Sequence, residues 1–123
     1  MITPTEAQKL AGENLVGFPP GLIAAYLAFA ETGDDTKLDV VVLGVLEFYL
    51  AKKPAAPLAT LPGTTRLVED LGCDSLTMMD TVFMAETLLG VKIDDAEFPR
   101  LATLDALRGY LRRLVKDGAP AAT

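Results

Sequence analysis

A chain of 123 residues, half of them hydrophobic and 23% charged, is expected to fold as one small domain, and this composition excludes an intrinsically disordered protein. It holds one cysteine, Cys73, and no histidine, which excludes an internal disulfide, a structural zinc cluster and a Ser-His-Asp or Cys-His catalytic group. The net charge of −6 is uneven, because residues 67–98 carry eight acidic side chains against one lysine while residues 99–116 sum to +4. An acidic field of this kind repels nucleic acid and attracts basic protein surfaces.

The beginning of the chain predicts two short helices. Residues 3–6, TPTE, combine a capping threonine, a proline at the first helical position and a capping-box glutamate, which predicts a helix over residues 4–11. A Pro-Pro-Gly break at 19–21 follows. The segment 20–31 then has the alanine and leucine content of a second helix, ending near Gly33.

The next segment, residues 37–52, predicts a helix that is apolar around most of its circumference. Thr36 and Asp39 resemble a capping box, and the predicted helix, residues 37–52, stops before Pro54. A buried strand is the alternative, but the apolar run is long for a strand. Its excess apolar surface needs a cover, and the simplest cover is the segment 20–31. Self-association is the competing use of the same surface.

Residues 54–73 predict a long loop. Three prolines and two glycines rule out a long helix there, yet apolar residues recur through the segment. We expect these residues to fix the loop to the core: Leu58, Leu61, Leu67, Val68 and Leu71. Long loops of this kind are uncommon in small domains and suggest a function.

A further helix is predicted from Asp74, a candidate N-cap, to a closing glycine at Gly90. The apolar periodicity assigns its buried face to Leu76, Met78, Val82, Ala85 and Leu89. The outward positions are then Thr77, Met79, Asp80, Phe83, Glu86 and Thr87.

The rest of the chain predicts a connector with one helical turn at 95–98 and a final amphipathic helix. That helix opens on a Thr103 cap, ends at Gly118 and carries an apolar stripe of Leu104, Leu107, Leu111, Leu114 and Val115. Residues 117–123 are expected to form a disordered tail.

The stretch LVEDLGCDSLTMMDTVFMAETLLGVKI, residues 67–93, resembles the acyl carrier protein family. Asp-Ser-Leu alone is common, but here Glu-Asp-Leu-Gly precedes it and Gly-Val-Lys-Ile follows it at the family spacing. The resemblance runs from about Lys37 to Val115. It implies an all-α fold, a small antiparallel four-helix bundle with a long first loop over residues 36–116. Residues 1–35 would be an N-terminal helical extension packed on the first bundle helix.

The resemblance also implies a covalent cofactor, 4′-phosphopantetheine, attached to Ser75 by a separate phosphopantetheinyl transferase. Asp74 and Leu76 flank this serine in the family motif, and Asp74 would help the transferase to recognise it. Ser75 then needs no internal base, and the protein is expected not to be an enzyme. An ordinary serine in the first turn of a helix is the alternative. Cys73 is expected to be a small buried filler, because Asp70 and Asp74 would disfavour its thiolate.

Carriers of this family hold the acyl chain between their helices, and the candidate lining residues are Leu46, Leu50, Leu67, Leu76, Met84 and Leu104, all of which could equally be packing residues.

Partners are expected to be acyl-transferring and synthase enzymes that dock on Met79, Asp80, Phe83 and Glu86. Only two of the outward positions are acidic, a departure from the acid-rich helix of the family, and Phe83 could equally belong to the core.

The function that follows is a specialised carrier of acyl thioesters for fatty acid, polyketide or related lipid biosynthesis. The alternatives are a peptidyl or aryl carrier and an unmodified helical interaction module. A cytoplasmic protein is expected, with no metal, no nucleic acid and no stable membrane insertion, since Pro-Pro-Gly interrupts the apolar run at 15–30. It would be a monomer, or a homodimer formed through the N-terminal region.

Overall fold

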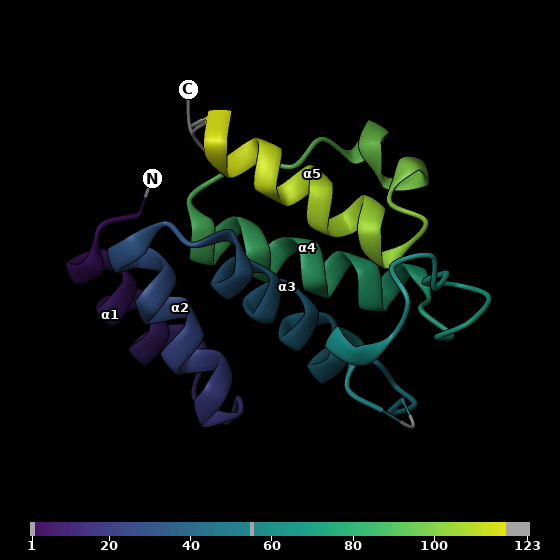
Figure 1. Ribbon diagram of the computed structural model, residues 1–123, viewed down its shortest axis with the longest axis horizontal. Helices are drawn as coiled ribbons and strands as arrows, with labels where there is room; N and C mark the ends of the chain where they lie inside the picture. Colours follow the sequence, from purple (N-terminus) through teal and green to yellow (C-terminus); the bar gives the residue numbers. More distant parts are fainter. Residues whose placement is uncertain (1, 55, 118–123) are drawn as a thin grey trace.

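The computed structural model describes residues 2–54 and 56–117, which form five α-helices and two 3₁₀ helices (Figure 1). The elements in chain order are α1 Pro4–Asn14, α2 Pro20–Thr32, α3 Asp35–Tyr49, η1 Leu58–Thr60, α4 Ser75–Leu89, η2 Asp95–Arg100 and α5 Leu104–Asp117. Strand pairing in this part of the chain is limited to one antiparallel bridge between Arg66 and Thr103. The all-α fold is thus confirmed. Apart from Asp117, the expected tail lies outside the described residues.

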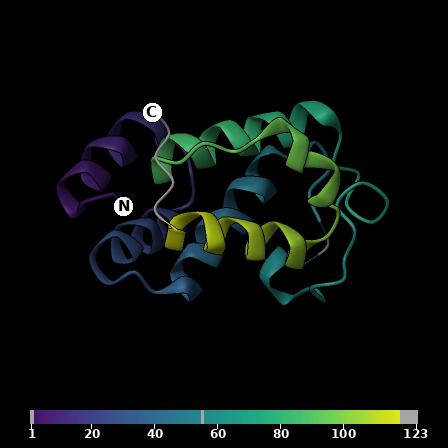
Figure 2. The ribbon, with the colours of Figure 1, turned by 90° about the horizontal axis from the view of Figure 1, so that it is seen from above.

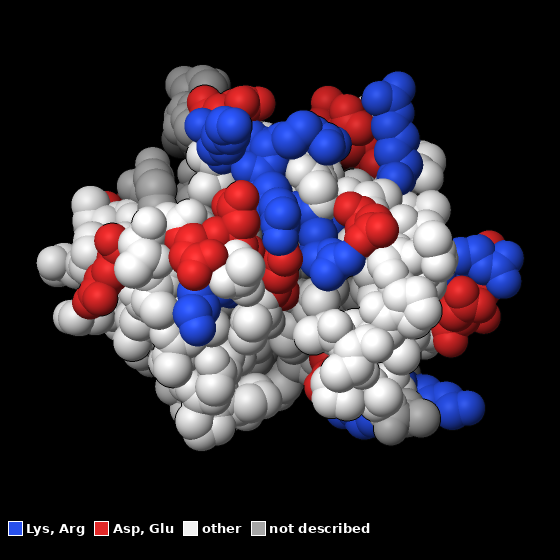
Figure 3. All heavy atoms as spheres, viewed as in Figure 1, with Lys and Arg blue, Asp and Glu red and all other residues white. Residues whose placement is uncertain are grey.

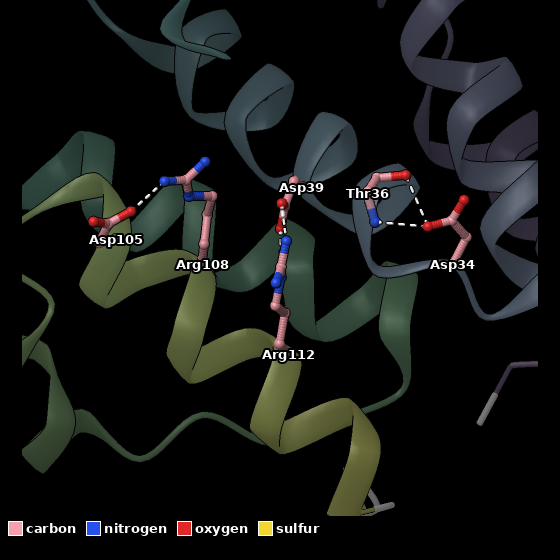
Figure 4. A network of polar contacts seen from close by, with 6 residues as sticks. All are labelled: Asp34, Thr36, Asp39, Asp105, Arg108 and Arg112. Carbon is pink, nitrogen blue, oxygen red and sulfur yellow. Dashed lines mark hydrogen bonds and ion pairs between the residues drawn. The ribbon is translucent and has the colours of Figure 1, made fainter. Parts of the chain in front are cut away.

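The boundary between α2 and α3 differs from the prediction. Gly33 ends α2 with φ +71°, as expected, but the cap of α3 is Asp34 and not Thr36. One carboxylate oxygen of Asp34 accepts from the Thr36 backbone N–H at 2.9 Å and from its hydroxyl at 2.8 Å (Figure 4). Because an aspartate two residues earlier satisfies these donors, the helix begins at Asp35.

Helix α3 is the centre of the molecule. It packs against α2, α4, α5 and η1, and its buried residues are Leu38, Val41, Val42, Leu43, Val45 and Leu46. Two residues that interrupt the apolar sequence of α3 also contact neighbouring elements. Glu47 accepts from the Leu58 N–H at 3.1 Å, and Gly44 lies directly beneath Leu22 of α2. Val40 and Phe48 are the large apolar side chains of α3 that remain exposed, and Tyr49 is half-buried.

Helix α2 lies along α3 and also reaches α4. Its buried residues recur at helical spacing on one face: Leu22, Ala25, Tyr26, Phe29 and Ala30. Tyr26 is completely buried, and its hydroxyl donates a hydrogen bond to the backbone carbonyl of Leu88. That carbonyl is one of the last four of α4, which have no partner within their own helix. The α2 segment therefore contributes both apolar cover and a polar contact to the C-terminal end of α4.

Helix α5 is joined to α3 by an ion pair. Arg112 donates to both carboxylate oxygens of Asp39, one of them at 2.9 Å (Figure 4). Basic side chains gather over α5 on the face drawn in Figure 3, and within this group Arg108 pairs with Asp105. Part of the positive charge that the sequence places in residues 99–116 is thus used in contacts inside the molecule.

The connector after α4 returns the chain to the beginning of that helix. Figures 1 and 2 both show it running back beside α4, so that η2 lies near the end at which α4 starts. The described parts of the long loop, residues 51–54 and 56–74, lie at the same end of the molecule. The loop before α4 and the connector after it therefore lie at the same end of the helix, near its first turn.

Candidate functional site

Ser75, which is also the only serine in the chain, is the first residue of α4 and is exposed to solvent. Asp74 precedes it with extended backbone angles, and its carboxylate accepts from the Thr77 N–H at 2.8 Å. Asp74 is therefore the N-cap that the sequence predicts. Ser75 lies in the first turn of α4, where N–H groups without a partner in the helix and the partial positive charge of the helix end favour an anion.

The loop before α4 is held in place by backbone contacts. Leu67 is completely buried, and its N–H donates to the Ala102 carbonyl at 2.9 Å while its carbonyl accepts from Cys73 at 2.9 Å. Gly72 adopts φ +69°, a conformation that favours glycine, and donates to the Val68 carbonyl at 3.0 Å. These bonds fix the position from which Asp74 and Ser75 start the helix.

The leucine-rich loop agrees with the prediction except at one residue. Leu58 and Leu67 are buried, and Leu61 and Leu71 are half-buried against the core. Val68, in contrast, is exposed. The tight turn closed by the Gly72 N–H directs Val68 outward, so it cannot fix the loop to the core.

Two charged groups in this loop are locally satisfied. Asp70 accepts from the Arg66 backbone N–H at 2.8 Å and from its guanidinium at 3.3 Å, and these contacts lower the pKa of Asp70. Cys73 is buried, and burial, reinforced by the charge of Asp74, raises the pKa of its thiol. A thiol in this state is a poor nucleophile, as expected for a packing residue.

A groove of about 750 Å³ begins at Ser75 and follows α4. One wall is a helical stripe of α4 that consists of Ser75, Met78, Met79, Val82, Phe83 and Glu86. The remaining walls come from the loop before α4 and from the connector around η2, with Leu67, Val68, Cys73, Asp74, Lys92, Phe98, Pro99, Leu101 and Ala102. The groove is mainly apolar, so it suits a hydrocarbon chain better than a polar ligand.

Most of the candidate lining residues do not line this groove. Among them only Leu67 does so. Leu46, Leu50 and Leu104 are buried in the helix core, Met84 packs against that core, and Leu76 is exposed. The sequence missed Phe98 and Pro99, because the long connector brings them opposite α4 and no local pattern encodes that contact.

The register of α4 also differs from the prediction. Thr77 is buried and Leu76 is exposed, the reverse of the expected assignment. Met79 and Phe83 are exposed, as predicted, and Asp80 is half-buried. The carboxylate of Glu86 accepts from the Ile93 N–H at 2.7 Å and lies 3.8 Å from Lys92. Glu86 therefore holds the start of the connector, a use that its outward position in the sequence did not suggest.

Three proteins named acyl carrier protein are similar to part of this chain. The protein of Thermotoga maritima is 38% identical over 48 residues, which are 39% of this chain and 59% of that protein. The Rhodococcus erythropolis protein is 35% identical over 54 residues, 44% of this chain and 59% of that protein. The Campylobacter hominis protein is 32% identical over 53 residues, 43% of this chain and 67% of that protein.

The chain belongs to the acyl carrier protein family. The matches cover 59% of the length of the Thermotoga and Rhodococcus acyl carrier proteins, and they cover 39% and 44% of this chain, so more than half of this chain lies outside each match. No family model and no solved structure matches the chain.

In this member of the acyl carrier protein family, none of the described helices has the length and apolarity needed to cross a membrane. Residues 2–54 and 56–117 contain no cluster of acidic or cysteine side chains suited to a metal ion.

The cap of α4 predicts a pH dependence of stability. The Thr77 backbone N–H, and then its hydroxyl, lower the pKa of Asp74 in the folded protein. The stabilisation is therefore complete above the pKa of an unfolded aspartate, about 3.9, and is lost as the pH falls through the lower folded value. Asp74→Asn keeps a cap that does not titrate, so its unfolding free energy is expected to fall less than that of the wild type on acidification.

Urea unfolding between about pH 3 and pH 7 measures this difference. Asp34→Asn is a parallel variant, because the Thr36 hydroxyl and backbone N–H lower the pKa of Asp34 in the same way at α3. Equal pH slopes for wild type and Asp74→Asn would contradict the assignment of this carboxylate as a charged cap.

Proposed function

We propose that this protein carries acyl groups as thioesters on a 4′-phosphopantetheine arm joined to Ser75 by a phosphodiester. The observation that carries the proposal is an exposed hydroxyl at the start of α4, at the mouth of an apolar groove. When bound, the arm would supply a terminal thiol that forms the thioester. The protein supplies the attachment point and the environment of the phosphate.

The residues around Ser75 fit such a group. The negative phosphodiester would lie beside the N–H groups of the first turn of α4, where the helix dipole offsets the charge of Asp74. The Asp74 carboxylate already accepts from Thr77 and so keeps the turn closed. Since the serine is activated by a separate transferase, the absence of histidine from the chain does not obstruct this chemistry.

The cargo that the groove supports is an apolar acyl chain, as in fatty acid, polyketide or related lipid biosynthesis. Met78 and Met79 offer flexible apolar contacts along α4, and Val82 adds a rigid apolar one. A peptidyl or aryl carrier is the second candidate, because the outward face of α4 is poor in acidic side chains. An unmodified interaction module is the third, because large apolar side chains are exposed beside Ser75.

The remaining parts of the proposal concern organisation. Residues 36–116 would form the carrier domain and residues 1–35 an extension on its first helix, which the packing of α2 on α3 supports. The protein would act on no substrate itself and would meet a phosphopantetheinyl transferase and acyl-transferring or synthase enzymes. Its cytoplasmic location stays a prediction.

Intact-mass measurement tests the attachment site. After incubation with coenzyme A and a broad-specificity phosphopantetheinyl transferase, the wild type is expected to gain one phosphopantetheinyl group and Ser75→Ala none. Thr64→Ala, which removes another exposed hydroxyl, is the matched control and is expected to be modified fully. An unmodified wild type would favour the interaction module, and a modified Ser75→Ala would place the arm on another residue. Loading with acyl or aminoacyl donors then separates the first two candidates.

A further inference from the structure

The end of α4 is covered by the N-terminal part of the chain. The hydroxyl of the completely buried Tyr26 in α2 donates to the Leu88 carbonyl. Ile2 lies over the glycine that ends α4, because a Cβ atom built on Gly90 would be 3.1 Å from the Ile2 Cδ1 atom. Helix α1 packs against α4 as well. Separate contacts from the start of the chain thus meet at the last turn of α4.

The same turn directs the connector. Gly90 ends α4 with φ +65°, and its N–H donates to the Glu86 carbonyl at 2.9 Å. The carboxylate of Glu86 accepts from the Ile93 N–H at 2.7 Å, and the Ile93 side chain is buried. We call residues 86–93 the α4 joint. Because the joint is held both by its own bonds and by the start of the chain, it fixes the direction in which the connector leaves α4.

The connector that starts at the joint carries one wall of the groove. Phe98 and Pro99 line the groove opposite α4, and both belong to η2. The Asp94 carboxylate caps η2 by accepting from the Ala96 N–H at 2.9 Å, directly after the joint. A short capped helix of this kind moves as a unit when its start is displaced. A shift at the joint would therefore change the separation of η2 and α4.

We propose that Tyr26 is a positioning residue for the groove: through the α4 joint, it sets the separation of η2 and α4 and with it the affinity of the groove for an apolar chain. Tyr26 does not itself line the groove. The far end of the wall is held independently, by the Leu67 N–H on the Ala102 carbonyl at 2.9 Å, so the joint is the end on which Tyr26 acts. The groove as a cargo site rests on the proposed function, whereas the coupling to Tyr26 does not.

Binding of N-phenyl-1-naphthylamine, an uncharged apolar fluorophore, to the unmodified full chain tests this coupling. Tyr26→Phe removes only the hydroxyl and is expected to raise the Kd by about three- to fivefold, because a less preorganised wall binds more weakly and one hydrogen bond bounds the effect. Tyr110→Phe is the matched control. It removes the hydroxyl of a half-buried tyrosine in α5 that does not line the groove, and it is expected to leave the Kd unchanged.

Further variants separate positioning from loss of stability. Val45→Ala truncates a buried side chain of α3 and lowers global stability, yet it is expected to leave the Kd unchanged under conditions in which the protein is folded. In the Phe98→Ala background the wall lacks its ring, so Tyr26→Phe is expected to have no further effect. Ile2→Ala uncovers the joint at Gly90 and is expected to raise the Kd in the same direction as Tyr26→Phe.

Equal Kd values for the wild type and Tyr26→Phe would overturn the inference. An increase in Val45→Ala as large as that in Tyr26→Phe would do so too, because affinity would then follow global stability. A wild type that does not bind the probe would remove the groove as a binding site, and with it the inference. The proposed function fails separately, in the mass measurement, because the probe is bound by a chain that carries no arm.

Discussion

Removal of residues 1–33 is expected to lower the free energy of unfolding by at least about 4 kcal/mol and to promote self-association. The deletion uncovers the side of α3 on which α2 lies, and with it the surface that Leu22, Tyr26 and Phe29 bury. Full burial of one large apolar side chain contributes about 1.5–3 kcal/mol. The loss of Tyr26 also leaves the Leu88 carbonyl without its donor.

A loss of that size is large compared with the total stability of a small domain, about 5–15 kcal/mol. Urea unfolding of the full chain and of residues 34–123 measures it, and sedimentation velocity reports the association state. Ala24→Gln, on the exposed face of α2, is the control and is expected to leave the unfolding midpoint unchanged. If the truncated protein unfolds at the same urea concentration and stays monomeric, residues 1–33 are a dispensable tail.

Local signals explain why the position of Ser75 could be predicted from the sequence. An aspartate that accepts from the third residue of a helix and a glycine with φ +65° at its end are both encoded by a few adjacent residues. The start and the end of α4 therefore follow from Asp74 and Gly90. The same local reasoning placed the Thr103 cap of α5, which accepts from the Ala106 N–H at 3.1 Å.

The face that α4 buries could not be predicted in the same way. Hydrophobic periodicity favoured Leu76 as a buried residue and Thr77 as an exposed one. In the structure, Thr81 donates from its hydroxyl to the Thr77 carbonyl at 2.8 Å, so its polar atom is satisfied inside the helix while its methyl group packs. A threonine whose hydroxyl donates to a carbonyl of its own helix can take the place of an apolar residue in a core. The buried face of α4 therefore contains Thr77 in place of Leu76, one position away from the face that hydrophobic periodicity predicts.

The groove depends on contacts that are distant in sequence. Phe98 and Pro99 face α4 because the connector runs back along that helix, and the Leu67 N–H joins the loop to the Ala102 carbonyl. Composition and periodicity describe each segment separately. They therefore predict the helices but not the wall opposite α4, and the proposed role of Ser75 comes from the family resemblance and not from these patterns.

Because α2 and α3 are in close contact at Gly44, we expect Gly44→Ala to change the stability of the protein in opposite directions in the wild-type and Leu22→Ala backgrounds. A Cβ atom at Gly44 would lie 2.5 Å from the Leu22 Cδ1 atom and 3.3 Å from its Cγ atom. Alanine is better than glycine in a helix by about 1 kcal/mol, but overpacking a buried contact costs about 1–3 kcal/mol. We expect Gly44→Ala to destabilise the wild-type protein by about 1 kcal/mol.

In the Leu22→Ala background the obstructing atoms are gone, so Gly44→Ala is expected to stabilise the protein by up to about 1 kcal/mol. The double-mutant cycle from urea unfolding then gives a coupling of about 2 kcal/mol between the two positions. Gly12→Ala in α1 is the matched control, because a Cβ atom there meets nothing within 4 Å and only the gain in helix propensity remains. Equal stabilisation by Gly44→Ala and Gly12→Ala in the wild-type background would mean that Leu22 does not press on α3, and the close packing of the N-terminal segment would have to be abandoned.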